Sequence, residues 1–309
     1  MLTDATVGDP LSGLKWTRKS PRKLAKVLRR KGFPTSHETV RRLLERLGYS
    51  LKGNRKRLGK RQDAERDRQM RYLARQRRAF VKAKKPALSV DTKKKELVGN
   101  FKNSGRTWRQ EAVAVLATDF LTDADGKAIP YGVYDITRNT GWVRVGISHD
   151  TAEFAVNVIG AWWQREGQVV YAGQRELLIQ ADSGGANGYR SWLWKWELQQ
   201  FADETGLTIS VTHYPTSASK WNWIEHRLFG PISRNWAGQP LLNYETILKC
   251  IRATETETGL RCRAYLDKAI YETRKKIAPE QKASIDLIPH RVLPKWNYTI
   301  KPRTTPRKK

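Results

Sequence analysis

Three acidic residues have types and positions that could bind metal ions: Asp91, Asp182 and Glu225. Magnesium takes oxygen ligands and keeps several of its waters, so a magnesium site needs carboxylates that converge although they lie far apart in the sequence. Two such ions held about 4 Å apart would activate an attacking oxygen and stabilise a leaving one. The chemistry predicted from these residues is the breaking and making of phosphodiester bonds.

Each acid on its own also has an ordinary structural explanation. Asp91 could cap a turn, Asp182 could end a strand, and Glu225 could be a solvated helix residue. Asp182 is informative because it follows five uncharged residues, where an ionised group needs a partner or a metal. Asn222 lies one helical turn before Glu225 in a predicted helix. It could position a phosphate or a metal-bound water, or it could be a simple polar surface residue.

Other acids compete for a place in such a site. Asp135 lies in a predicted strand near Asp91, whereas Asp150 precedes a predicted helix start and is better explained as the N-cap of that helix. The remaining candidates lie in a loop with Gly126 and are interpreted as turn residues: Asp119, Asp123 and Asp125.

The elements that must position these acids follow from the hydrophobic pattern. Short β-rich runs predict five strands: 88–92, 131–136, 142–147, 177–181 and 207–212. A further candidate strand lies at 112–116. Amphipathic patterns predict helices that alternate with the later strands: 151–168, 189–204 and 220–235. If the first and fourth strands are neighbours, Asp91 and Asp182 can face each other, and a helix over the strand ends can supply Glu225. The order predicts an α/β fold with a mixed five-stranded sheet flanked by helices, compatible with a ribonuclease-H-like domain over 87–240.

The segments on either side of this domain are predicted to be helical. An N-cap at Ser20 and a capping box at 35–38 begin two short helices, which predict an all-α helix-turn-helix module with a basic linker over 1–62, or else a plain helical hairpin. In such a module the second helix lies in the major groove, with these groove-facing candidates: Ser36, His37, Thr39, Arg41 and Arg42. We expect a connecting helix over 63–86 and a helical C-terminal extension with a basic tail over 241–309.

The charge of the chain predicts a nucleic-acid partner. The formal net charge is +29, and the first 90 residues hold 27 Lys and Arg against 7 Asp and Glu. Beyond the predicted groove-facing residues, we expect phosphate contacts at seven further basic residues: Arg55, Lys56, Arg57, Lys93, Lys94, Lys95 and Lys220. The alternative is that these residues form solvated charge runs without a DNA contact.

The sequence also limits where the chain is expected to act. The only two cysteines, Cys250 and Cys262, have a spacing that matches no zinc motif, and no signal peptide or membrane-spanning stretch is recognisable. We therefore expect a cytoplasmic, nucleoid-associated bacterial protein.

Several long runs in the chain resemble the Rhodopirellula-type DDE transposases of bacterial insertion sequences. They are SVDTKKKELVGNF (89–101), YGVYD (131–135), HDTAEFA (149–155), ADSGG (181–185) and SKWNWIEHRLF (219–229). The resemblance extends from the region of Trp16 to Trp296, Asn297 and Tyr298. It implies a triad of metal-binding acids at Asp91, Asp182 and Glu225, with two magnesium ions that manganese could replace.

The resemblance further implies an activity and its partners. A DDE transposase would hydrolyse phosphodiester bonds at terminal inverted repeats and transfer a 3′ hydroxyl into target DNA, as a homodimer in the DNA complex. Members of the family usually begin with a further DNA-binding segment, so we expect a shortened copy. The alternatives are a catalytically inactive DNA-binding regulator derived from a transposase and a structure-selective nuclease on the same fold.

Overall fold

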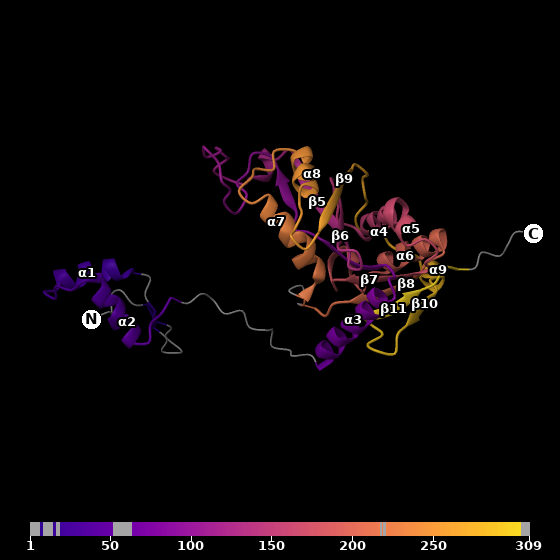
Figure 1. Cartoon of the computed structure of the whole chain (residues 1–309), viewed down its shortest axis with the longest axis horizontal. Coiled ribbons are helices and arrows are strands. Elements are labelled where there is room, and N and C mark those ends of the chain that lie inside the picture. The colour runs from indigo at the N-terminus through magenta and orange to yellow at the C-terminus, as the bar shows by residue number, and fades with distance from the viewer. Residues whose placement is uncertain are drawn as a thin grey trace, which may run out of the picture. The chain divides into compact units, whose positions relative to one another are not determined.

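The computed structural model describes residues 7–8, 15–16, 19–51, 64–216, 218 and 221–303. The chain divides into two compact units, Met1–Arg61 and Gln62–Lys309 (Figure 1). Each unit is described separately below.

The first unit contains two short helices and one two-stranded ribbon. Its elements are β1 (Val7–Gly8), β2 (Lys15–Trp16), α1 (Pro21–Arg30) and α2 (His37–Arg46). Ser20 begins the first helix as predicted, because its hydroxyl accepts a hydrogen bond from the backbone N–H of Lys23. The capping box predicted at 35–38 would make Thr35 the N-cap of the second helix, but the N-cap is Ser36, whose hydroxyl accepts from the N–H of Thr39.

A small apolar cluster holds these two helices together. Leu24, Ala25 and Val40 are buried, and Leu28 and Leu44 pack against them. Two further leucines stay exposed: Leu43 in α2 and Leu47 directly after it.

The second unit is built on one mixed sheet that is larger than predicted. In the part of this unit that the structure describes, the sheet has nine strands: eight follow the order β10-β11-β8-β7-β3-β5-β6-β9, and β4 pairs with β5. The five predicted strands form its centre: β3 (Ala87–Thr92), β5 (Gly126–Asp135), β6 (Thr140–Gly146), β7 (Glu176–Ala181) and β8 (Thr208–His213). The first and fourth of these, β3 and β7, are neighbours and run parallel, which meets the condition for Asp91 and Asp182 to face each other. The candidate strand at 112–116 is not formed.

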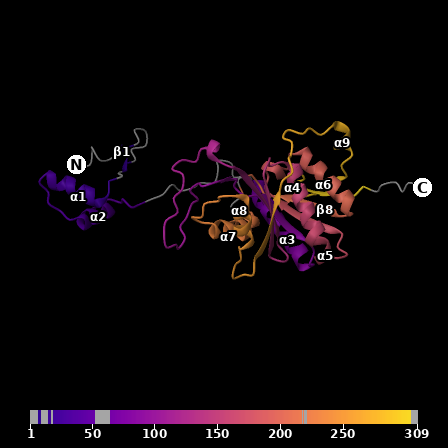
Figure 2. The ribbon, with the colours of Figure 1, turned by 90° about the horizontal axis from the view of Figure 1, so that it is seen from above.

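Helices cover both faces of this sheet (Figure 2). One face carries α4 (Ala152–Trp162), η3 (Trp163–Gly167), α5 (Gln168–Val170) and α6 (Trp192–Thr205). The opposite face carries η6 (Glu225–Phe229), α7 (Gly230–Asn235) and α8 (Tyr244–Arg252). The chain also forms η2 (Leu121–Asp123) and η4 (Gly185–Asn187) between these elements. The predicted mixed α/β fold is therefore confirmed.

The helix α3 (Ala64–Lys82) belongs to this second unit, where it packs against β3 and β7. Its Gln69 is fully buried and exchanges hydrogen bonds of 2.7 Å with Asn297. Its Leu73 carbonyl accepts a hydrogen bond of 2.9 Å from Gln180 on β7. These buried polar contacts fix the inner face of the helix on the sheet.

The region after Pro240 was predicted to be helical, and this was only partly right. It contains α8 and α9 (Pro279–Ala283), but its strands also widen the sheet at both edges: β9 (Arg261–Asp267), β10 (Leu287–Pro289) and β11 (Asn297–Ile300). β9 pairs in parallel with β6, and β11 pairs antiparallel to β8. Together with β4 (Glu96–Val98), they raise the count above the five strands predicted.

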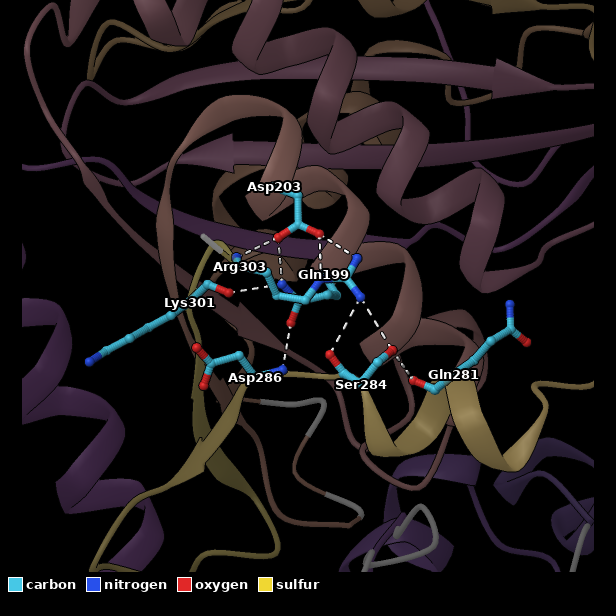
Figure 3. Close-up of polar contacts among 7 residues, drawn as sticks. All are labelled: Gln199, Asp203, Gln281, Ser284, Asp286, Lys301 and Arg303. Carbon is cyan, nitrogen blue, oxygen red and sulfur yellow. Dashed lines mark hydrogen bonds and ion pairs between the residues drawn. The ribbon is translucent and has the colours of Figure 1, made fainter. Parts of the chain in front are cut away.

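Polar contacts anchor the last described residues to α6 (Figure 3). Arg303 donates from its backbone and its guanidinium to the carboxylate of Asp203, and Gln199 donates to the carbonyl of Lys301 at 2.8 Å. Arg303 also reaches Ser284 beyond α9, at 3.2 Å from its hydroxyl. This clamp ties residues 301–303 to both α6 and the loop after α9.

No helix in the described part of the chain is long and apolar enough to cross a membrane.

Candidate active site

The parallel pairing of β3 and β7 brings two of the predicted acids together. Val90 is in register with Ala181, and the next residue along each chain segment is an acid: Asp91 within β3 and Asp182 directly after β7. Side chains one step beyond a registered pair of parallel strands lie on the same face of the sheet. The backbone N–H of Thr92 donates to Oδ1 of Asp91, and Ser183 does the same for Asp182, each at 2.8 Å.

Asn222 links the segment after β8 to the first acid. Its side-chain nitrogen donates to Oδ2 of Asp91 at 3.0 Å, and its oxygen accepts from the hydroxyl of Ser89 at 2.9 Å. The same hydroxyl accepts from the backbone N–H of Ile224 at 3.2 Å. Asn222 is fully buried, which overturns the alternative of a polar surface residue. It also lies before the helical segment, which begins at residue 223, and not within it as predicted.

Glu225 opens the π-helical turn η6, which packs directly on the sheet. Gly132 on β5 is paired with Asp91, and a Cβ built on it would lie 2.6 Å from Phe229 and 3.0 Å from Ile224. A side chain at this position would therefore push η6 away from β5. Because Gly132 has no side chain, the turn that carries Glu225 can lie over the sheet face onto which Asp91 projects.

The three acids are close enough to affect one another. The pKa of Asp91 is raised to about 8, mainly by burial and then by the charge of Asp182, with smaller contributions from Glu225 and Asp150; the hydrogen bond from Thr92 works in the opposite direction. These mutual effects indicate that the three carboxylates share one electrostatic environment.

The other two acids have raised pKa values as well. Burial is the main cause for both, while the Ser183 N–H works in the opposite direction at Asp182. At Glu225, Lys93 lowers the pKa and the charge of Asp182 raises it. Within the described residues, no three His, Cys, Asp or Glu side chains already stand as a set of metal ligands. The site therefore gathers acidic groups at the carboxyl ends of two central strands, β3 and β7, without a closed ligand cage among the described residues.

Comparison with known proteins identifies the family. The family described as Rhodopirellula transposase DDE domain matches residues 1–302. The chain belongs to this family. That membership makes it a DDE-type DNA transposase, and it confirms the resemblance seen in the sequence.

Solved structures of one other transposase show a distant similarity. The chain is 15% identical to the Mos1 transposase in its paired-end complex with the left transposon end (TM-score 0.45) and in a pre-cleavage Mos1 transpososome (TM-score 0.46). It is 13% identical to the mariner Mos1 paired-end complex with Mg (TM-score 0.44). Each match covers 79% of this chain and 73% of the other. No curated protein sequence matches the chain.

Asp150 of the transposase has a role that sequence reasoning missed. It was predicted to cap the following helix, but the cap is Thr151, whose hydroxyl accepts from the N–H of Phe154 at 3.1 Å. Asp150 instead accepts from the hydroxyl of Thr92 at 2.9 Å and pairs with Lys95 at 3.3 Å. It thus contacts the segment that follows Asp91. Sequence alone could not separate two adjacent residues that can both cap a helix.

The lysines after Asp91 occupy different environments. Lys93 is buried, pairs with Glu96 at 2.9 Å and lies 4.3 Å from the ring centre of Trp236. Its positive charge is therefore paired within the protein. Lys94 is exposed and Lys95 pairs with Asp150. Of the three predicted phosphate contacts, Lys94 and Lys95 reach solvent and Lys93 does not.

Buried polar residues support the loop after Asp182. Asn187 accepts a hydrogen bond of 2.7 Å from the hydroxyl of Tyr131 on β5. The ring of His213 contacts the backbone carbonyl of Asp182 at 3.0 Å through Nδ1 and the hydroxyl of Tyr298 at 3.1 Å through Nε2. Burial lowers the pKa of His213 to about 4, so the ring is neutral and donates through Nδ1.

The predicted DNA-reading residues of α2 are exposed, but several are already engaged. The hydroxyls of Ser36 and Thr39 contact each other at the helix start, 2.9 Å apart. Arg41 bonds to Glu38 and Glu45, and Arg42 lies 3.6 Å from Glu38. His37 is exposed. Their place in the major groove stays a prediction. The remaining basic candidates lie outside the described residues: Arg55, Lys56, Arg57 and Lys220.

Proposed function

We propose that Asp91, Asp182 and Glu225 form the catalytic site with which this transposase cuts transposon ends and joins them to target DNA. The observation that carries the proposal is the register of β3 and β7, which sets the two aspartates side by side with Asn222 bonded to the first. The central strand order β6-β5-β3-β7-β8 fits a ribonuclease-H-like core.

A divalent cation fits this set of residues. All three donors are hard carboxylate oxygens, which suit Mg²⁺ or Mn²⁺, and their mutual repulsion is the electrostatic situation that a cation relieves. Active-site groups are often looser in a free enzyme than in its working complex, which is consistent with the open arrangement of the acids. When bound, two such ions supply Lewis acidity at the attacking and leaving oxygens of a phosphodiester.

The protein's own groups then orient the reaction. Asn222 and the Thr92 N–H each fix one oxygen of Asp91, and the Ser183 N–H fixes one oxygen of Asp182. Such preorganisation means that little rearrangement is needed when DNA arrives. The same site would first hydrolyse the bond at the transposon end and then position the freed 3′ hydroxyl against target DNA. No covalent protein intermediate is required.

The partners follow from this chemistry. We infer that the enzyme acts on the terminal inverted repeats of an insertion sequence and on target DNA, as a homodimer because two ends must be joined. The helices α1 and α2 would act as a helix-turn-helix module. Their candidate DNA contacts are Ser36, His37, Thr39, Arg41 and Arg42.

A cleavage assay tests the proposal. Purified full-length protein and a duplex that carries the element's terminal repeat are incubated over a range of Mg²⁺ concentrations. Asp182→Ala should abolish strand cutting and leave DNA binding largely intact, whereas the exposed Asp119→Ala should cut like the wild type. Nicking by Asp182→Ala in magnesium would contradict the proposal. Salt-sensitive binding by the wild type without any product would favour a DNA-binding regulator.

A further inference from the structure

A row of four arginines follows the outer face of α3. Arg68, Arg71, Arg75 and Arg78 are all exposed, and their spacing of three, four and three residues places them on one side of the helix. With Tyr72 and Val292 they line a groove of about 630 Å³. We call these four residues the arginine row.

None of the four arginines forms an ion pair among the residues that the structure describes. The two acids of α3 lie in its first turn: Glu65 pairs with Lys295, and the exposed Asp67 lies one turn before Arg71 without an ion pair to it. Arg75 stacks 5.0 Å from the ring centre of Tyr72, and Arg78 donates to the backbone carbonyl of Ala74 at 3.3 Å. Neither contact neutralises a guanidinium, so the row keeps a net excess of positive charge even with Asp67 beside its first turn.

Such a row has no evident benefit for folding. Like charges three and four residues apart destabilise a helix, and the row contains three such neighbouring pairs. The fold is secured by the opposite side of α3, where Gln69 bonds to Asn297 and the Leu73 carbonyl accepts from Gln180. The arginines therefore stand on a rigid helix whose packing does not need them.

We propose that the arginine row is a docking surface for the phosphate backbone of duplex DNA. A helix rises 1.5 Å per residue, so the row is about 15 Å long. One strand of DNA carries a phosphate roughly every 3.4 Å along the axis, so the row can face about four phosphates. Guanidinium groups suit phosphates because they donate in a fixed fork geometry. The inference rests on the proposed function for the identity of the polyanion.

The test measures DNA binding separately from cutting. Fluorescence anisotropy follows binding of a labelled duplex to the full-length chain in EDTA, at several KCl concentrations. The row variant carries Arg68→Gln, Arg71→Gln, Arg75→Gln and Arg78→Gln. A control variant loses the same charge at exposed residues on other elements: Arg175→Gln, Arg261→Gln, Lys268→Gln and Lys276→Gln.

The row variant should bind at least about tenfold more weakly at low salt, and the slope of log K against log [KCl] should fall by roughly 0.9 for each lost phosphate contact, hence by about 3 to 4. The control variant should change the slope by less than about 1. Replacing the four arginines with lysine should restore most of the slope, because the charges return. Without DNA, the row variant should unfold at the wild-type temperature or above it.

Four results would overturn the inference. Wild-type affinity and slope in the row variant would refute this surface while leaving the proposed function standing. A lower unfolding temperature would show that the arginines serve the fold. Loss of binding to anionic lipid vesicles with DNA binding unchanged would assign the row to a membrane. If the wild type binds no duplex at all, the proposed function fails together with this inference.

Discussion

Removal of the Asn222 side chain should damage both the stability and the chemistry of the site. The side chain is fully buried and makes two hydrogen bonds, to Asp91 at 3.0 Å and to Ser89 at 2.9 Å. Above the pKa of Asp91, about 8, the bond to its ionised carboxylate contributes about 1.5–3 kcal/mol and the neutral bond to Ser89 about 0.5–1.5 kcal/mol. At such a pH, Asn222→Ala should therefore lower the free energy of unfolding by about 2–4 kcal/mol. In a unit of this size, each kcal/mol lowers Tm by about 2–4 °C.

The same change should slow DNA cutting, because Asp91 loses the donor that orients its Oδ2. A misplacement of about 1 Å can cost a factor of roughly 100 in rate, and we expect a loss of that order. Urea unfolding and single-turnover cleavage, measured where the variant is still folded, check the two effects. The control Asn100→Ala removes an exposed side chain that donates to Ala114, and it should change stability by less than about 0.5 kcal/mol. Wild-type stability and cleavage in Asn222→Ala would refute the reasoning.

Three further predictions follow from other contacts. Gly132→Ala should lower the free energy of unfolding by about 1–3 kcal/mol, because the new Cβ would lie 2.6 Å from Phe229. The rate of DNA cleavage should fall as well. Wild-type cleavage would show that the close approach of η6 is dispensable. The pKa of His213 is lowered from 6.5 to about 4 in the native state. As the pH falls from 6.5 to 4, His213 is therefore protonated in the unfolded chain but still neutral in the native state. The native state should lose roughly 3 kcal/mol of stability over this window from this residue, and denaturant titrations of His213→Gln should lack that part of the pH dependence. Asp203→Asn should weaken the clamp on Arg303 and lower stability by about 1 kcal/mol or less, with cleavage retained; a loss of cleavage would show that the clamp supports the site.

The convergence of the aspartates could be predicted because it depends on regular strand geometry. Asp91 and Asp182 each lie near the carboxyl end of a β-rich run, and neighbouring parallel strands bring such ends together. The position of Glu225 could be predicted only as a helix over the strand ends. Its π-helical turn has no sequence signal, and its close packing depends on a glycine of another strand, Gly132.

Contacts that depend on the path of the chain could not be predicted. The sequence spacing predicts that Asn222 shares a helix face with Glu225. In the structure Asn222 precedes the helical turn and bonds to Ser89 and Asp91, because the segment after β8 passes over β3 before that turn begins. The three late strands were missed for a different reason. β10 and β11 span only three and four residues, too short for an alternating pattern to emerge. β9 does alternate, with Cys262 and Ala264 buried between exposed arginines, and this signal was available in the sequence.

The most direct test of the catalytic site asks whether its acids touch the metal. Asp91→Cys, Asp182→Cys and Glu225→Cys each replace a hard oxygen ligand with a softer sulfur, which binds Mg²⁺ poorly and accepts Mn²⁺ more readily. Cleavage of terminal-repeat DNA is then compared in the two metals, with the exposed Asp119→Cys as the control. We predict that each of the three variants loses cutting in Mg²⁺ and recovers part of it in Mn²⁺, while the control cuts in both. Wild-type cutting in Mg²⁺ by any of the three would contradict the assignment of that residue as a metal ligand.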